Sequence, residues 1–300
     1  MPSVRIVSWN SGGEAAGRQN QLVTAVNFFN ATAPPVDLVT IQEAAVRPGG
    51  VIRARLGGGV VPFNNFAPPD HVREQTAAQT FQVARSKAYL IAWAQAGPGA
   101  LVPGPAAQLV SLAPVQVPAP NGVAQYIAGL SMNGMPLSPR INANLLEAAG
   151  NIRAPVRKTF TVTVAGVLHT LYFYTWHGNL QSQWGNATYL QLGLTQNPFT
   201  VGSEGMYPAF MFLQQCNRYQ ADLAAVNANQ SDVLIVAGDL NISVPDVTRS
   251  AALVFPGFDG ASDNLSHILA FSKSPNLVIA QDDNFGAPPG HNILTAEVQW

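Results

Sequence analysis

Short runs of strand-forming residues recur along the chain, and Gly, Pro and Asn separate each run from the next. Val4–Trp9 alternates between apolar and polar residues, whereas Val233–Ala237 is apolar throughout, as expected of a buried strand. The same criteria predict further strands at Val36–Ile41, Tyr89–Trp93, Thr159–Val164 and Leu168–Trp176. Only a short Ala-Gly-Val turn separates the last two runs, so we predict that they form a β-hairpin.

Two segments have apolar residues at helical spacing. Leu22, Val26 and Phe29 recur in this way within Gln19–Asn30, and Phe210–Asn227 has a similar pattern shortly before the buried strand. Both segments are predicted to be helices. Strands and helices mixed along a chain in this way are typical of an α/β fold, here a two-layered or four-layered sandwich.

Two segments do not fit the pattern of core strands or helices. Gly97–Asn121 is rich in Pro, which removes a ladder donor, so we predict a loop excursion or an edge element there. A second excursion, rich in Gln, Asn, Gly and aromatic residues, runs from Gly178 to about Pro208. No internal repeat and no linker divides the chain. We therefore predict one domain over residues 1–300, with loop excursions near 97–150 and 178–208.

The composition is that of a folded chain with little charge. Of the 300 residues, 47% are hydrophobic and 10% are charged, and the net charge is −1, which excludes the disordered class and a broadly basic coat for nucleic acid. No apolar run approaches the roughly 18 residues of a membrane span. Cys216 is the only cysteine, so the chain has no intramolecular disulfide and no cysteine metal cage.

The first residues do not resemble a signal peptide. A signal peptide has a basic segment followed by a long apolar run, whereas here a predicted strand begins directly after Met1-Pro2-Ser3. We therefore expect a cytoplasmic protein, a protein that is exported without a classical leader, or a mature form.

Polar residues follow the predicted strands at the points where these strands end. Most such residues only mark the entry into a loop. Asp239 and Asn241, however, follow the buried strand two residues apart, so both side chains are expected to point to the same face. A carboxylate and an amide placed together can hold one water or one phosphate oxygen. The other strand ends carry Asn10, Gln42-Glu43 and His177, and the last segment carries His291.

In this order, the motifs resemble those of the endonuclease/exonuclease/phosphatase superfamily, which has the deoxyribonuclease-I-like fold. The likeness rests on Trp9-Asn10, Gln42-Glu43, the strand-borne His177, Gly238-Asp239-Leu240-Asn241 and the C-terminal His291. Through Gln42-Glu43-Ala44 and its length, the chain is most similar to the catalytic B subunit of cytolethal distending toxins. The resemblance implies a four-layered α/β (α+β) sandwich in which helices flank two packed mixed β-sheets.

The resemblance also implies that water hydrolyses a phosphodiester or a phosphomonoester. Such a reaction requires a hard divalent cation, an activated water and donors for the developing charge. The implied ion is Mg²⁺, with Mn²⁺ or Ca²⁺ as alternatives, held by the carboxylate of Glu43 with Asn10 as an amide ligand or orienting group. An arginine that binds phosphate is expected just before the hairpin. Arg153 has this place, and Arg157 is the alternative.

Four more residues receive roles from the resemblance. Asp239 and Asn241 would position the attacking water and the scissile phosphate. His177 and His291 would be the general acid and base, because imidazoles transfer protons near neutral pH.

Two positions depart from the superfamily's pattern. Gly290 precedes His291 where Asp is usual, and Ser266 stands where Asp usually holds the catalytic imidazole. A hydroxyl accepts a hydrogen bond from the ring but does not stabilise an imidazolium by charge, so His291 is expected to be a weaker base. Carboxylates that could substitute are present in the same region, at Asp259, Asp263, Asp282 and Asp283.

Three functions are compatible with these residues. The first is a Mg²⁺-dependent deoxyribonuclease of the toxin B-subunit type, which would be secreted with delivery subunits and cut DNA inside a target cell. The second is a phosphatase that acts on a lipid headgroup or another phosphorylated small molecule, because the same centre positions either phosphate. The third is a binding subunit whose activity is weakened or lost through Gly290 and Ser266.

Overall fold

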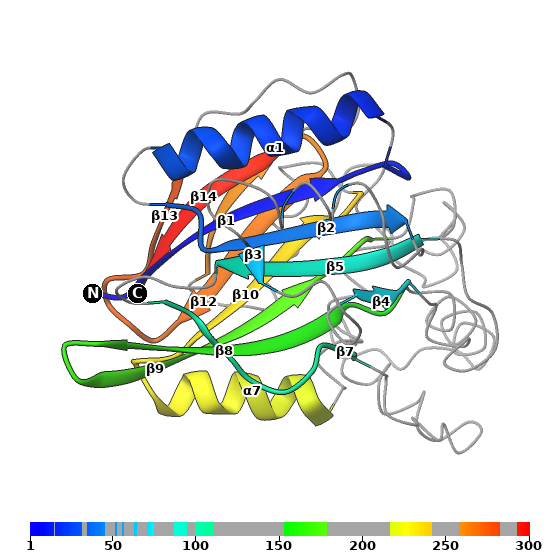
Figure 1. Ribbon diagram of the computed structural model, residues 1–300. Coiled ribbons are helices and arrows are strands. Elements are labelled where there is room, and N and C mark those ends of the chain that lie inside the picture. Colours follow the sequence, from blue (N-terminus) through cyan, green and yellow to red (C-terminus); the bar gives the residue numbers. More distant parts are fainter. Residues whose placement is uncertain are drawn as a thin grey trace, which may run out of the picture.

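The structure is a computed structural model, which describes residues 1–14, 16–31, 35–45, 52, 56, 63–64, 71–74, 87–94, 100–110, 153–178, 217–241, 258–282 and 293–300. In these ranges, two β-sheets pack face to face. Helix α1 (Ala16–Ala31) covers the outer face of the first sheet, and helix α7 (Asn217–Ala228) covers that of the second (Figure 1). The prediction of a four-layered α/β sandwich is therefore confirmed. No helix within the described ranges is long and apolar enough to cross a membrane.

The first sheet is mixed and has β1 near its centre. Its strand order is β13-β14-β1-β2-β5-β3, and β4 pairs with β5. Strands β1 and β2 are parallel, whereas β14 pairs antiparallel with β1 and β5 pairs antiparallel with β2. The strands are β1 (Ser3–Asn10), β2 (Leu38–Ala45), β3 (Phe63–Asn64), β4 (His71–Arg73), β5 (Lys87–Ala94), β13 (Val278–Gln281) and β14 (Leu294–Gln299).

The second sheet is mixed in the same way. Its order is β11-β12-β10-β9-β8-β6, and β7 pairs with β8. Strands β9 and β10 are parallel, and the other pairs are antiparallel. The strands are β6 (Val102–Pro103), β7 (Gln108–Leu109), β8 (Val156–Val164), β9 (Val167–Thr175), β10 (Val233–Asp239), β11 (Asp259–Asp263) and β12 (Ser266–Ser272).

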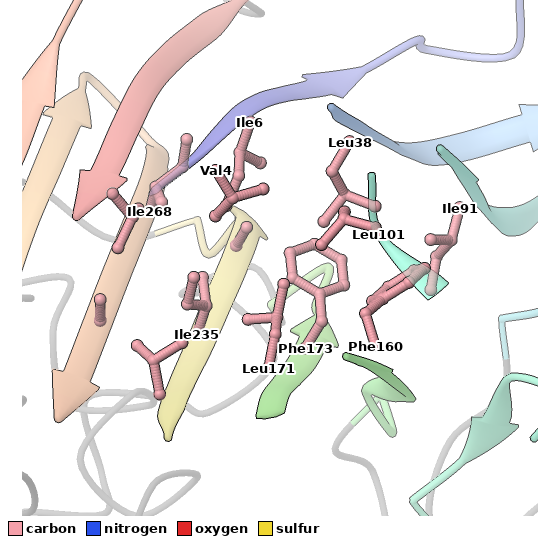
Figure 2. Packing of buried hydrophobic residues seen from close by; sticks show 14 of the residues in the cluster. Val4, Ile6, Leu38, Ile91, Leu101, Phe160, Leu171, Phe173, Ile235 and Ile268 are labelled. Atoms are coloured by element: carbon pink, nitrogen blue, oxygen red, sulfur yellow. The ribbon is translucent and has the colours of Figure 1, made fainter. Parts of the chain in front are cut away.

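Among the described residues, an extensive apolar core lies between the two sheets. Side chains along a strand alternate between its faces, so every second residue points inward. Val4 and Ile6 of β1 enter the core from one sheet, and Leu171 and Phe173 of β9 enter it from the other (Figure 2). A second cluster lies between α1 and the outer face of the first sheet. Burial of this apolar surface is the main force that holds the layers together.

The strands and helices predicted from the sequence are present, with shifted ends. The predicted hairpin is formed by β8 and β9, and its turn residues Ala165 and Gly166 have positive φ angles of 50° and 81°. Helix α7 begins at Asn217, and residues 210–216 of the predicted helix lie outside the described residues. Strands β11 to β14 were not predicted. In β11, the sequence Asp259–Asp263 has no apolar alternation, and the strand forms through its pairing with β12.

The first predicted loop excursion is described only in part. Residues 100–110 form the short strands β6 and β7, which pair with β8 at the edge of the second sheet. The prediction of an edge element is confirmed for these residues, and Pro103 in β6 fits an edge, because an edge strand needs fewer ladder donors. Residues 111–150 and, after Gly178, the second excursion lie outside the described residues.

Candidate active site

The inward-facing positions of the strands change from apolar to polar at one end of the sandwich. On β1, Val4 and Ile6 are followed on the same face by Ser8 and Asn10, and the neighbouring strands change at corresponding positions. We call this end of the sandwich the polar end. Its members are Ser8, Asn10, Thr40, Gln42, Thr175, Asp239, Asp263 and Ser266, with His177 two residues after the end of β9.

His177 is held at the polar end by two charged side chains. Its Nδ1–H donates to Glu74 Oε2 over 2.9 Å, and its Nε2 accepts from Arg153 Nη1 over 2.7 Å. These contacts assign the neutral Nδ1–H tautomer, because a carboxylate only accepts and a guanidinium only donates. His177 is 3% exposed and Glu74 is 1% exposed, so little water competes for either side chain.

Glu74 was not among the predicted site residues. It follows β4 directly, and its Oε1 accepts from the backbone N–H of Glu43 over 2.8 Å. Burial alone would raise the pKa of Glu74, but contacts with His177, the N–H of Glu43 and the charge of Arg153 outweigh burial and lower the pKa below its ordinary 4.5. Glu74 is therefore an anion that orients the imidazole. In the sequence, Glu74 is a carboxylate that follows three residues, His71–Arg73, whose pattern does not predict a strand.

Of the two candidate arginines, Arg153 contacts His177 and Arg157 does not. Besides His177, Arg153 Nη1 donates to the carbonyl oxygen of Gly178 over 2.9 Å. Arg157 instead binds Asp222 of α7, with 2.6 Å between Nη2 and Oδ1. Two arginines four residues apart diverge in this way because Arg157 lies on β8 and faces the helix layer, whereas Arg153 precedes the strand.

Glu43 faces His177 from the other sheet. Strand β2 pairs regularly with β5 up to Ile41 and again from Ala44, and at the bulge between them Glu43 has a φ of 55°. A bulge redirects a side chain out of the alternation of its strand. Glu43 Oε1 lies 3.5 Å from His177 Nε2, and Oε2 contacts Lys87 Nζ. The carboxylate is thus turned toward the imidazole and toward a cation.

The third carboxylate at the polar end, Asp239, accepts a hydrogen bond on each oxygen. Asn10 Nδ2 donates to Oδ2 over 2.8 Å, and the backbone N–H of Asn241 donates to Oδ1 over 3.0 Å. Asn10 Oδ1 accepts from the N–H of Gly12 over 3.0 Å. Asn241 reaches Asp239 through a turn, because β10 ends at Asp239 and Asn241 has a φ of 54°. The expected strand alternation therefore does not bring these two residues together.

The close approach of β9 and β10 requires glycine at position 238. Gly238 has a φ of 154°, and a Cβ atom there would lie 1.8 Å from the carbonyl oxygen of Trp176. Beyond the end of β9, the N–H of Gly178 still donates to the carbonyl of Asp239 over 2.7 Å. The backbone that carries His177 is therefore held against the end of β10.

The predicted site residues form two groups that share one backbone carbonyl. Gly178 O accepts from Arg153 Nη1 in the first group and from Asn241 Nδ2, over 2.9 Å, in the second. The first group is Glu43, Arg153 and His177, and the second is Asn10, Asp239 and Asn241. His291, Gly290 and Asp283 lie outside the described residues.

Asp263 is the carboxylate that lies beside Ser266. In the strand register, Ser266 is opposite Asp239 on one side and Asp263 on the other, so all three side chains share a face. Asp263 Oδ2 is buried and has no hydrogen-bond partner among the described residues. Asp259 and Asp282 are engaged elsewhere, with a backbone N–H of β13 and with a buried arginine.

The donor set suits a hard cation, although the described residues contain no group of three His, Cys, Asp or Glu side chains that could hold a metal ion. Glu43 is 13% exposed and already contacts the ammonium of Lys87, so its carboxylate is placed where a positive charge is favoured. The amide oxygen of Asn10 has a second lone pair besides the one that accepts from Gly12. One carboxylate and one amide oxygen fit Mg²⁺, which keeps several of its waters.

Solved structures share this fold. The catalytic domain of human Nocturnin, solved with a bound sulfate anion, aligns over 99% of this chain and 93% of its own length, with 13% identity and a TM-score of 0.51. An endonuclease/exonuclease/phosphatase from Bacteroides vulgatus aligns over 100% and 99%, with 9% identity and a TM-score of 0.49. Truncated Caenorhabditis elegans TDP2 aligns over 99% and 97%, with 10% identity and a TM-score of 0.49. No protein-family model matches the chain, and the search of curated proteins found no similar sequence.

The chain therefore has the deoxyribonuclease-I-like fold of two packed mixed sheets, as the sequence predicts. At 13% identity the likeness to Nocturnin concerns the fold alone. The chemistry must be argued from the residues at the polar end.

Proposed function

We propose that the protein is a metal-dependent phosphodiester hydrolase whose substrate is DNA. The observation that carries the proposal is the contact of His177 with Glu74 and Arg153, beside Glu43 at 3.5 Å from the imidazole. This arrangement combines a proton-transfer group, a phosphate-binding cation and a carboxylate for a divalent metal. Each of the three lowers the barrier to hydrolysis at phosphorus.

His177 is the acid–base residue in this proposal. Glu74 holds the proton on Nδ1, so Nε2 is the atom that exchanges a proton with the attacking water or the leaving oxygen. Arg153 donates to Nε2 and would donate to a phosphate oxygen of a substrate bound beside it, because its forked N–H groups match that geometry. Asp239, which Asn10 and the N–H of Asn241 hold in place, would orient the attacking water.

Mg²⁺ is the cation that we assign to Glu43 and Asn10, with Mn²⁺ or Ca²⁺ as alternatives. When bound, the ion would neutralise the charge that develops on the phosphate. The residues of the chain hold the reactants in line and keep the imidazole in one tautomer, which is the larger part of catalysis in phosphate transfer.

Support for DNA comes from the order of the sequence motifs, which is most similar to that of toxin B subunits. A protein of the toxin B-subunit type would also have delivery subunits and would act inside a target cell. The Nocturnin domain, which shares the fold, was solved with a sulfate anion, whose tetrahedral shape is that of a phosphate group. A phosphorylated small molecule or lipid headgroup would fit the same centre, and the experiment below separates the two substrates.

The test incubates the purified protein with supercoiled plasmid and Mg²⁺, and compares wild type with His177→Ala and His169→Ala. His169 is a matched control because it lies near the other end of β9, where its Nδ1 donates to the carbonyl of Ser231 over 2.8 Å. We expect His177→Ala to lower the nicking rate by about 10²- to 10⁴-fold, His169→Ala to retain it, and chelation of Mg²⁺ to abolish it.

A second arm measures phosphate release from a phosphoinositide by the same preparations. Release of phosphate with intact plasmid would replace DNA by a phosphomonoester as the substrate. Nicking that persists unchanged in His177→Ala would identify a contaminating nuclease. Absence of both activities in the wild type would contradict the proposal and favour a binding subunit.

A further inference from the structure

A buried hydrogen-bond network joins the two sheets directly behind the site. Gln42 Nε2 donates to Thr175 Oγ1 over 3.0 Å, and Thr40 Oγ1 donates to the same hydroxyl over 2.5 Å. Ser8 Oγ accepts from Gln42 Nε2 at 3.5 Å. Ser8, Thr40 and Gln42 belong to the first sheet and Thr175 to the second, and all four are fully buried. We call these four residues the inter-sheet network.

Stability does not explain the inter-sheet network. The preceding positions on the same strand faces are apolar, namely Ile6, Leu38 and Phe173, so carbon side chains pack well at this depth. Gln42 Oε1 is buried without a hydrogen-bond partner among the described residues. An unpaired buried acceptor is destabilising, and an apolar set of the same shape would be equally stable or more stable.

The positions of the network residues point to the site instead. Gln42 immediately precedes Glu43, and Thr175 precedes His177 by two residues. The ladder between β2 and β5 is interrupted at the bulge that contains Glu43, so on this side the backbone pairing does not hold the carboxylate in place. The hydrogen bond from Gln42 to Thr175 supplies a link across the sheets at this point.

We propose that Gln42 is a positioning residue of the active site. Through Thr175 it sets the separation of the sheets at the polar end, and thereby the 3.5 Å between Glu43 Oε1 and His177 Nε2. This inference rests on the proposed function, in which these two residues are the metal carboxylate and the acid–base group. A displacement of about 1 Å at such a site lowers the rate by about 100-fold.

The test replaces the polar atoms by carbon at nearly constant volume, in Gln42→Met and Thr175→Val. We expect Gln42→Met to keep or raise the free energy of unfolding, because it removes the unpaired Oε1, whereas Thr175→Val should lower it, because Gln42 Nε2 and Thr40 Oγ1 then lack their acceptor. Both variants should lower kcat for plasmid cleavage by about tenfold or more and leave KM within about twofold. The double variant should lose no more kcat than Thr175→Val alone, because Thr175→Val already removes the acceptor of the Gln42 hydrogen bond. Thr161→Val, on the outer face of β8, is the matched control and should retain kcat.

A second readout does not depend on activity. The imidazole NMR signals of His177, identified by their loss in His177→Ala, should shift in Gln42→Met and stay in place in Thr161→Val. Unchanged kcat and unchanged signals would overturn the inference. A fall in kcat of Gln42→Met that merely follows a loss of unfolding free energy would overturn it too. If the wild type has no hydrolase activity, the proposed function fails, and the imidazole signals alone decide whether Gln42 positions His177.

Discussion

At the scale of single residues, Glu74 links the two sides of the site. One of its oxygens accepts from the backbone of Glu43 and the other from the imidazole of His177. An amide has only one oxygen, so Glu74→Gln turns an N–H toward one of these donors. We expect kcat for hydrolysis to fall about 100-fold while the protein remains folded. Steady-state kinetics measures this, and wild-type rates would contradict the role of Glu74.

The same substitution has a pH-dependent effect on stability. The pKa of Glu74 is lowered in the folded protein, so its carboxylate stabilises the fold above the ordinary pKa of 4.5, and this stabilisation is lost as the pH falls through the lower folded value. The gap in unfolding free energy between wild type and Glu74→Gln should therefore be full at pH 7 and shrink below about pH 4. Urea unfolding of both proteins at pH 7 and below pH 4 measures this difference, and a difference that does not change with pH would refute the prediction.

Asp263 allows a rescue experiment beside Ser266. The two residues are directly opposite in the β11–β12 register, with Cβ atoms about 5 Å apart, so a carboxylate on either one reaches the same space. We expect Asp263→Asn to lower kcat about tenfold and the added Ser266→Asp to restore most of it. Asp259→Asn, at the other end of β11, is the control. Full activity in Asp263→Asn would show that the site does not use this carboxylate.

At the scale of elements, Asp222 of α7 forms hydrogen bonds to two side chains of the second sheet. Asp222 accepts from Arg157 Nε at 2.5 Å and from the hydroxyl of Tyr174 at 2.6 Å. Burial, followed by the charge of Asp222, raises the pKa of Tyr174, so its hydroxyl stays a donor. The contact is therefore a partly buried ion pair in which the carboxylate also accepts from a buried hydroxyl.

Asp222→Ala leaves the partly buried guanidinium of Arg157 and the buried hydroxyl of Tyr174 without their acceptor. We expect a loss of about 3 kcal/mol in the free energy of unfolding, measured by urea denaturation. Asn227→Ala on the exposed side of α7, where the side chain bonds only within the helix, should change it by less than about 0.5 kcal/mol. Similar losses in both variants would mean that helix propensity, not the anchor, holds α7.

The elements differ in how far the sequence predicted them. Strands with two apolar faces, such as β10, and the hairpin of β8 and β9 were predicted because their patterns are local. Strand β4 was missed because its three residues carry no periodic signal, and it forms through pairing with β5. With β4 unpredicted, Glu74 could not be placed near His177, 103 residues along the chain.

At the scale of the whole molecule, an acidic group lies at the end of the sandwich opposite the site. Asp37, just before β2, accepts from the backbone N–H of Arg5 over 2.8 Å. Burial, and to a lesser degree the charge of Glu297, raises the pKa of Asp37 to about 6, against the opposing effects of Arg5. Burial thus favours the neutral form of the Asp37 carboxyl.

Asp37 makes global stability depend on pH. A folded pKa above the unfolded value of 3.8 stabilises the fold at low pH, and this stabilisation is lost as the pH rises through about 6. From pH 4 to pH 7, Asp37→Asn should therefore gain about 2 kcal/mol relative to wild type, after allowance for partial exposure. Urea unfolding across this range tests the difference. Parallel curves for the two proteins would contradict the raised pKa.

The sequence by itself determined the layered α/β architecture, the strand ends at which polar residues gather, and the order Asn10, Glu43, His177, Asp239 in which they follow. These features depend on the periodicity of single strands, which neighbouring residues encode.

Only the tertiary structure decided which side chains meet. It shows that Arg153, and not Arg157, contacts His177, and that Glu74 is the other partner of His177. It also shows the hydrogen bond between Asn10 and Asp239, which are 229 residues apart in the chain. Strand register, a bulge and the packing of one sheet on the other set these contacts, and a shift of one residue would turn each side chain to the opposite face. Local sequence patterns favour one face of each strand but do not say which strands pair.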